Sequence, residues 1–174
     1  MRHGALAALM ALVWANPAAA RPPEALACAL QAAPQGLDAR VADVIISRDT
    51  ARGRAVLDDL HVVTDRCAND QFLTPRQRDA YFNYILGRMG RDVIDGRLAA
   101  VGVPSALIDR TLDIGPGNAN NPAEKVTQGD LRMVADALAQ AGKDPKAITP
   151  DGWALIAAWI VATANMFDGL RDLD

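Results

Sequence analysis

The feature that most constrains the fold of this chain is a stretch without charge near its C-terminal end. From Gly152 to Phe167 there are sixteen residues and no Asp, Glu, Lys or Arg. On a helix of 3.6 residues per turn, the apolar side chains of this stretch fall on every side. A helix that is apolar all round is buried, and sixteen residues fall short of the roughly 20 that cross a membrane. We therefore expect a central core helix here, with the other elements packed around it.

The two tryptophans of this stretch face different ways. Trp153 and Trp159 are six positions apart, which turns them about 120° from each other around a helix. We expect Trp153 to lie inside the domain, on one stripe with Ile156, Ile160 and Phe167. Trp159 is expected at the edge of the core or in a contact between two copies of the chain. It is therefore the candidate interaction surface, and a homodimer is an open alternative.

Apolar residues recur at helical spacing along most of the remaining chain, without a convincing alternating run of the strand type. Capping residues, prolines and glycines divide this pattern into six further helices. They are expected at residues 23–33, 38–48, 50–67, 75–101, 104–112 and 128–141. The predicted fold class is all-α: a compact orthogonal helical bundle of about six or seven helices around the apolar C-terminal helix.

The first twenty residues have the layout of a secretory signal. Arg2 supplies a basic start, residues 4–14 carry no charge, and small residues follow up to Ala20. Ala18 and Ala20 are the small side chains that signal peptidase prefers before its cleavage point. We expect residues 1–20 to be removed. This leaves residues 21–174 as a single helical domain in the periplasm or outside a bacterial cell, with no membrane span.

The processing route decides the fate of the first cysteine. A lipoprotein signal needs a large aliphatic residue three positions before the cysteine, and Ala25 stands there. Cys28 is then free to pair with Cys67, the second of two cysteines in the chain. An even number of cysteines in an exported chain usually indicates pairing, and the stripe of Val56, Leu60 and Val63 places Cys67 toward the core. We predict a Cys28–Cys67 disulfide; the alternative is two buried free thiols.

The charge balance argues against two classes of partner. The chain has 18 Lys and Arg against 21 Asp and Glu, a net charge of −3. Loss of Arg2 with the signal makes the mature chain one unit more negative. Nucleic acid and anionic membranes favour clustered basic residues, so neither is expected as a partner. Five arginines within residues 76–97 alternate with aspartates, which predicts a solvated helix face.

Side chains suited to catalysis are sparse. After signal removal the chain keeps one histidine, His61, and two serines, Ser47 and Ser105, and neither serine lies in a GxSxG motif. His61 and Asp65 share a helix face and would offer two metal ligands, while a solvated surface histidine explains the same pattern. We assign no catalytic residue, no cofactor and no metal site, and leave enzyme activity uncertain.

One short motif resembles that of a known family. Residues Leu73 to Gln77 read LTPRQ, which is similar to the LTxxQ motif of small periplasmic helical proteins that include stress chaperones and metal-resistance sensors. The resemblance implies a dimeric, helical, client-binding protein. It covers five residues, and no second full copy is present. A capping box at a helix start explains the same residues without a functional role.

The expected function is that of a small exported helical binding or protein-interaction domain, whose partner is a protein or a small molecule. One alternative is a periplasmic stress-chaperone-like or metal-responsive protein of the LTxxQ type. A further alternative is a hydrolase of unknown class.

Overall fold

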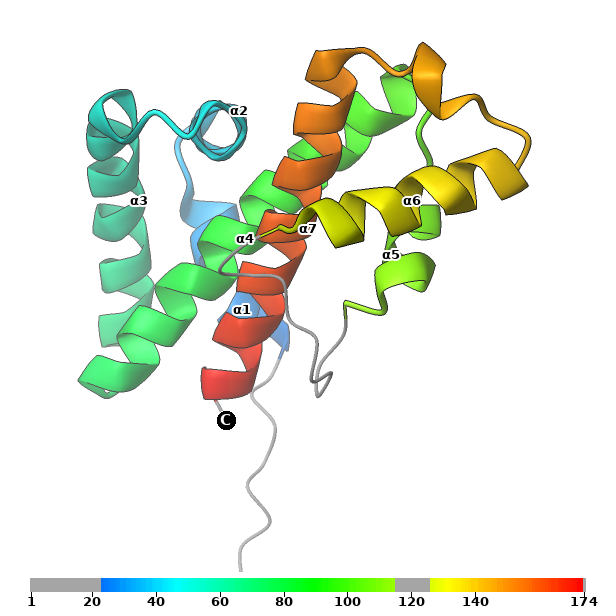
Figure 1. The fold of residues 1–174 in the computed structure, drawn as a ribbon. Coiled ribbons are helices and arrows are strands. Elements are labelled where there is room, and N and C mark those ends of the chain that lie inside the picture. Colours follow the sequence, from blue (N-terminus) through cyan, green and yellow to red (C-terminus); the bar gives the residue numbers. More distant parts are fainter. Residues whose placement is uncertain (1–22, 115–125, 174) are drawn as a thin grey trace, which may run out of the picture.

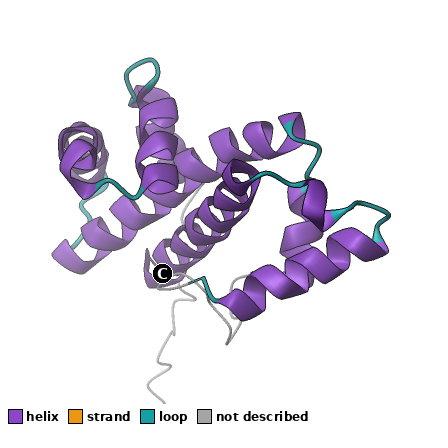
Figure 2. Cartoon of the chain, turned by 45° about the horizontal axis from the view of Figure 1, so that its top comes forward, coloured by secondary structure: helices purple, strands orange, loops and turns teal. Residues whose placement is uncertain are grey.

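The computed structural model describes residues 23–114 and 126–173 (Figure 1). Within these residues the chain forms seven α-helices, one short 3₁₀ helix and no strand (Figure 2). The helices are α1 (Pro23–Ala32), α2 (Leu37–Ser47), α3 (Thr50–Asp70), α4 (Pro75–Ala100), α5 (Ser105–Leu112), α6 (Gln128–Gln140) and α7 (Pro150–Leu173), with the 3₁₀ helix η1 (Pro145–Ala147) before α7. The expected all-α bundle is confirmed, whereas the signal segment lies outside the described residues.

Helices α4 and α7 form the axis of the bundle. They run antiparallel in direct contact, so that Gly87 of α4 lies against Met166 and Gly169 of α7 lies against Tyr84. The two backbones nearly touch at these glycines. A Cβ atom on Gly87 would lie 2.4 Å from the Met166 nitrogen, and one on Gly169 would lie 2.4 Å from the Tyr84 nitrogen. No side chain other than hydrogen fits at either position without moving a helix.

Two hydrophobic clusters lie along this axis. The first joins α1, α2 and α3 to the first half of α4 and the end of α7. The second joins α5 and α6 to the second half of α4 and the first half of α7. In Figure 1, α2 and α3 accordingly lie on one side of the α4–α7 pair, and α5 and α6 lie on the other. Helix α7 belongs to both clusters.

The uncharged stretch forms the central helix, as expected. Ile156 and Ile160 have no exposed surface. By length and composition α7 would be able to cross a membrane, yet 50% of its most apolar window is buried inside the protein. The helix also continues beyond Phe167 to Leu173. Leu173 returns to the core with 1% of its surface exposed, so the last turn also packs against the bundle.

The two tryptophans take places opposite to those expected. Trp159 has no exposed surface, whereas Trp153 is partly buried at the border of the second cluster. The reason is that α4 packs on the side of α7 that carries Trp159, Ala162 and Met166 at helical spacing. Trp159 therefore does not lie at the edge of the core. While this fold is intact, it offers no surface to a second copy.

The cysteines lie where the predicted disulfide requires them. The Sγ atoms of Cys28 in α1 and Cys67 in α3 are 2.02 Å apart, and their Cα atoms are 5.9 Å apart, within the range for a disulfide. Two polar side chains also bind α1: the Tyr81 hydroxyl accepts from the backbone N–H of Ala29 at 3.1 Å, and Gln71 Nε2 donates to the Ala25 carbonyl at 2.9 Å.

Candidate functional site

Two cavities open on neighbouring sides of the middle of α4. The first, which we call the polar pocket, has a volume of about 520 Å³ and lies among α4, α5 and α7. Its lining residues are Arg88, Arg91, Asp92, Asp95, Ser105, Ala106, Asp109 and Trp159. The second, the apolar pocket, has a volume of about 500 Å³ and lies between the α1–α2 turn and α4. Asp92 lines both cavities.

Two residues that line the polar pocket each have a buried hydrogen-bond donor that lacks an acceptor. The indole Nε1–H of the fully buried Trp159 has no partner among the described residues. The guanidinium of Arg91 lies over the same ring, with Cζ 5.2 Å from the ring centroid, and its Nε is likewise buried and unpaired. A buried donor without an acceptor costs about 1–3 kcal/mol. Neither donor is accessible from the cavity, so an acceptor would reach them only if the side chains around them moved.

An ion pair forms the α4 rim of this pocket. Arg88 Nε donates to Asp92 Oδ2 at 2.7 Å, and the Nη1 atom of Arg91 lies 3.9 Å from Asp92 Oδ1. The hydrogen bond to Asp92 raises the pKa of Arg88 above its already high ordinary value, against the opposing effect of burial. Arg88 therefore stays charged and compensates the negative charge of Asp92.

The first turn of α5 forms the opposite wall. The residue at its N-cap is Pro104, which has no side chain able to accept a hydrogen bond from the first turn. The uncapped N–H groups of Ser105 and Ala106 thus begin a helix at the pocket, where the helix dipole favours negative charge. The Ser105 hydroxyl donates to Asp95 Oδ1 across the cavity wall, and Asp109 lies one turn further along α5.

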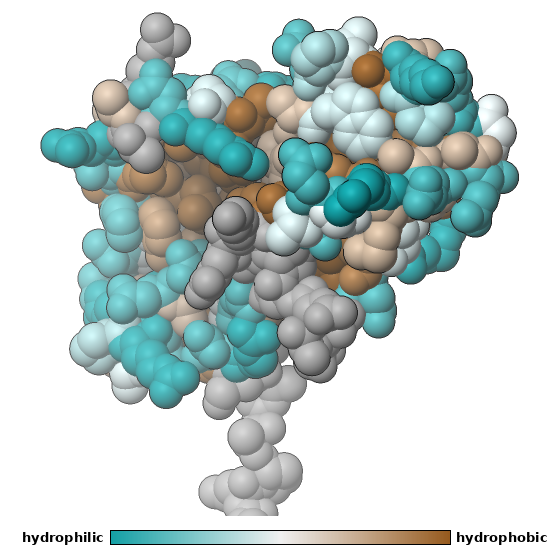
Figure 3. All heavy atoms as spheres, viewed as in Figure 1, coloured by the Kyte–Doolittle hydropathy of each residue, from teal (hydrophilic) through white to brown (hydrophobic). Residues whose placement is uncertain are grey.

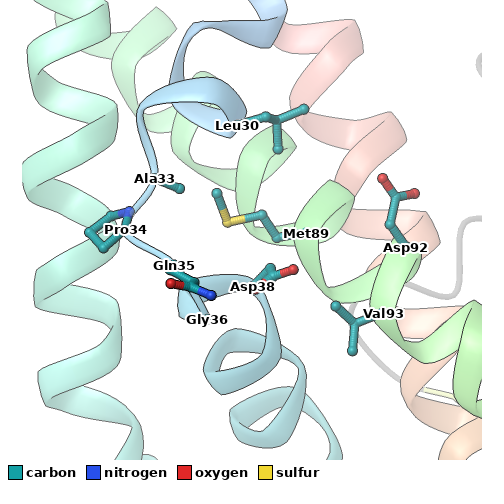
Figure 4. Close-up of a pocket in the computed structure, with 9 residues that line it drawn as sticks. All are labelled: Leu30, Ala33, Pro34, Gln35, Gly36, Asp38, Met89, Asp92 and Val93. Atoms are coloured by element: carbon teal, nitrogen blue, oxygen red, sulfur yellow. The ribbon is translucent and has the colours of Figure 1, made fainter.

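The apolar pocket has a different character. In Figure 4, Ala33 and Pro34 lie on the left of the cavity and Leu30 lies at its top, while Met89 and Val93 come from α4. Gln35, Gly36, Asp38 and Asp92 complete its lining. Hydrophilic residues cover most of the molecular face drawn in Figure 3, and hydrophobic residues show mainly in a recess toward the α2–α3 side of the bundle.

The polar residues singled out from the sequence do not converge on either pocket. His61 stacks on Phe82, with ring centroids 3.8 Å apart and ring planes 9° apart, at the exposed side of the α3–α4 pair. In the described parts of the chain, no group of three His, Cys, Asp or Glu residues is arranged to hold a metal ion. Ser47 lines neither pocket, whereas Ser105 belongs to the polar one.

The LTPRQ segment forms a complete helix cap. Thr74 Oγ1 accepts from the backbone N–H of Gln77, and Gln77 Oε1 accepts from the backbone N–H of Thr74. The Gln77 amide also donates to the Leu173 carbonyl at 3.2 Å. The motif thus starts α4 and ties its first turn to the end of α7.

Sequence reasoning missed the α4 side of the polar pocket. The alternating arginines and aspartates of residues 76–97 predict a solvated face, and Asp92 and Asp95 are exposed as that prediction requires. The sequence did not show that these residues also line a cavity, together with Arg88 and Arg91. The sequence does carry a weak signal, because oppositely charged residues recur at i, i+4 in the pairs 88/92 and 91/95. The rest of the pocket comes from Trp159 and α5, which no local pattern connects to α4.

No protein-family model, curated protein or solved structure matches this chain. The fold and the site define its class: an all-α bundle with a disulfide-compatible cysteine pair and a polar pocket, two of whose lining residues have buried, unpaired donors.

Proposed function

We propose that this chain is an exported binding protein that holds a small polar ligand in the polar pocket. The observation that carries the proposal is the pair of buried, unpaired donors, Trp159 Nε1–H and Arg91 Nε–H, beside one cavity. Folded proteins satisfy the large majority of their buried polar groups. A ligand whose hydrogen-bond acceptor enters between these side chains would pair the two donors.

Export is supported by two features of the chain. The first twenty residues have the layout of a secretory signal. The Cys28–Cys67 pair lies in disulfide geometry, and disulfides persist mainly in oxidising compartments outside the cytosol. Both features agree with a binding protein that works in the periplasm or outside the cell.

The composition of the pocket favours binding over hydrolysis. Ser105 is its single hydroxyl-bearing residue, and that hydroxyl donates to Asp95. His61, the histidine that remains after signal removal, stacks on Phe82 and is not among the lining residues. A serine nucleophile needs an adjacent base to accept its proton. Asp95 is the residue next to the Ser105 hydroxyl, but no third residue of the pocket holds its carboxylate in position as a catalytic base. The pocket is equipped to hold a ligand.

A thermal-shift screen of the mature protein against small polar molecules tests this function. A ligand at about 100 times its Kd stabilises the folded state by about 2.7 kcal/mol, which for a chain of this size raises Tm by about 5–10 °C. The Arg91→Gln variant should lose the shift, while Arg76→Gln, an exposed arginine of the same helix, should keep it. A screen in which no small molecule raises Tm would contradict the proposal.

A further inference from the structure

We infer that the apolar pocket is a second ligand site, which binds a small organic ammonium ion with an apolar body, such as an alkylamine. This site does not depend on the function proposed for the polar pocket. The cavity has a volume of about 500 Å³, which is within the range of small-molecule sites. A ligand reaches it from solvent, because Pro34, Gln35 and Asp38 of its lining are exposed.

The apolar body of the ligand follows from the inner side of the cavity. Met89 of α4 is 3% exposed, and Leu30, Ala33 and Val93 are partly buried around the same cavity. In Figure 4 the Met89 side chain extends from α4 toward the turn between α1 and α2. A methionine side chain is unbranched and adapts to apolar groups of different shape. Methylene groups of a ligand lose contact with water against this wall, which favours binding.

The positive charge of the ligand follows from the aspartates of the lining. Asp38 and Asp92 both line the cavity, but Arg88 compensates Asp92 through its hydrogen bond of 2.7 Å. Within residues 23–114 and 126–173, the Asp38 carboxylate has no hydrogen-bond or ion-pair partner. In Figure 4 this carboxylate points toward α4. One negative charge at the cavity therefore remains for a ligand cation to pair.

The two helix ends at this cavity do not change the sign of its charge. Helix α1 ends here without a basic residue in its last turn, and α2 begins here with Asp38 in its first turn. A helix C-terminus is equivalent to about −0.5 of a charge and an N-terminus to about +0.5, so the two ends cancel. Gln35 of the intervening turn also lines the cavity, and its amide oxygen can accept a second hydrogen bond from an ammonium group.

Methyl NMR of the methionines in the mature protein tests the site. Residues 21–174 contain three methionines: Met89 lines the apolar pocket, whereas Met133 and Met166 line neither pocket. Hexylamine, which is protonated at neutral pH, should move the Met89 methyl signal to saturation and leave the other two signals in place. A Met89 signal that does not respond to hexylamine would refute the inference.

Three related probes separate the charge from the apolar body. Hexanol, which lacks the charge, should bind about fivefold more weakly, the effect expected of one solvent-exposed ion pair. Hexanoate, which has the opposite charge, should bind more weakly than hexanol. Propylamine is three methylene groups shorter and should bind at least about tenfold more weakly than hexylamine. Hexanol or hexanoate that binds as tightly as hexylamine would exclude a cation site, and equally tight propylamine would exclude the apolar body.

Two variants locate the parts of the ligand. Asp38→Asn should weaken hexylamine about fivefold and leave hexanol unchanged, whereas Asp136→Asn, at an exposed position of α6, should change neither. Ala33→Leu adds side-chain volume to the cavity lining and should weaken both probes, with Ala139→Leu on the exposed side of α6 as its control. If Ala33→Leu does not fold, Asp38→Asn still decides. Equal hexylamine affinity in the wild type and Asp38→Asn overturns the inference.

Discussion

Phe72 occupies a backbone position that comparable turns of this chain give to glycine. Helices α3, α4 and α6 end in the same turn, in which an N–H donates to the carbonyl five residues earlier: Leu73 to Ala68, Val103 to Leu98 and Lys143 to Leu138. The residue before that donor has positive φ in each case, and it is Gly102 at 72°, Gly142 at 76° and Phe72 at 54°. This left-handed conformation disfavours a side chain. Phe72 is 91% exposed, so little burial offsets that cost.

We predict that Phe72→Gly stabilises the protein. The substitution removes the strain of the left-handed backbone, and this gain is larger than the cost of the extra conformational entropy that glycine gives the unfolded chain. The free energy of unfolding should therefore rise by about 0.5–1 kcal/mol in urea titrations. Val62 is the control, because it is 71% exposed but lies inside α3. Val62→Gly should lower the same quantity, since glycine is unfavourable in a helix interior. A loss of stability in Phe72→Gly would indicate that the aromatic ring contributes something the turn alone does not explain.

Tyr81 gives the fold a dependence on alkaline pH. Burial, partly opposed by the hydrogen bond from Ala29, raises the pKa of Tyr81 above its ordinary value of 10.0. The unfolded chain then loses this proton at lower pH than the folded protein does. The stabilisation is complete below about pH 10 and disappears as the pH rises through the folded-state pKa.

We therefore expect Tyr81→Phe to change the pH profile as well as the stability. At neutral pH the variant should be less stable by about 1 kcal/mol, because the Ala29 N–H loses its bond to the hydroxyl. The Ala25 carbonyl loses the same hydroxyl but keeps its hydrogen bond from Gln71. Between about pH 9 and pH 11 its stability should fall less steeply than that of the wild type. Urea unfolding monitored by circular dichroism measures both. Parallel profiles for the two proteins would show that Tyr81 is not the responsible group.

At the level of helices, the sequence predicted the elements well and their contacts poorly. Caps and prolines located all seven helices because these signals are local, as at Thr74 and Pro75 of α4. Glycines inside a helix usually weaken it, yet α4 is continuous from Pro75 to Ala100. Gly87 has its role in a contact with α7, and nothing near it in the sequence reveals a partner so far along the chain.

Glycine-to-alanine substitutions should separate these roles. Gly87→Ala places a Cβ against the backbone of α7, and overpacking of this kind costs about 1–3 kcal/mol or more. Gly96 lies in the same helix, and a Cβ atom added there would meet no atom within 4 Å, so Gly96→Ala should add about 0.5–1 kcal/mol through helix propensity. Thermal unfolding of both variants measures the contrast. Equal effects would mean that α4 and α7 are further apart than described.

For the whole molecule, the sequence predicted the class and the cysteine pairing but not the pocket. Helical periodicity and the number of cysteines can be read directly from the sequence, and the structure agrees with the all-α class and with the cysteine pair that they predict. The polar pocket draws Arg91 from α4, Ser105 from α5 and Trp159 from α7. The position of the pocket depends on how three helices pack. Trp159 is buried and Trp153 is not, the reverse of the expectation, so the sequence of α7 alone did not show which of its faces packs against α4.

We predict that the exported protein begins at Arg21 and contains the Cys28–Cys67 disulfide. Intact mass spectrometry should show two hydrogens fewer than the reduced chain. The cysteines are 39 positions apart, so reduction should lower the free energy of unfolding by about 4 kcal/mol on loop-entropy grounds. Two alkylatable thiols in the unreduced protein, or a lipid on Cys28, would disprove this processing.

The place of α7 in both hydrophobic clusters determines when the chain can complete its fold. Cys28 and Cys67 precede it by a long way, so the cysteine link can form before the last helix has joined the fold. Neither cluster closes before that, because each includes residues of α7. Incomplete chains therefore carry exposed apolar surface of the kind that leads to aggregation or degradation. Any chain that stops before Pro150 should therefore be degraded by proteases. The fold becomes resistant to proteolysis only when α7 has packed into both clusters.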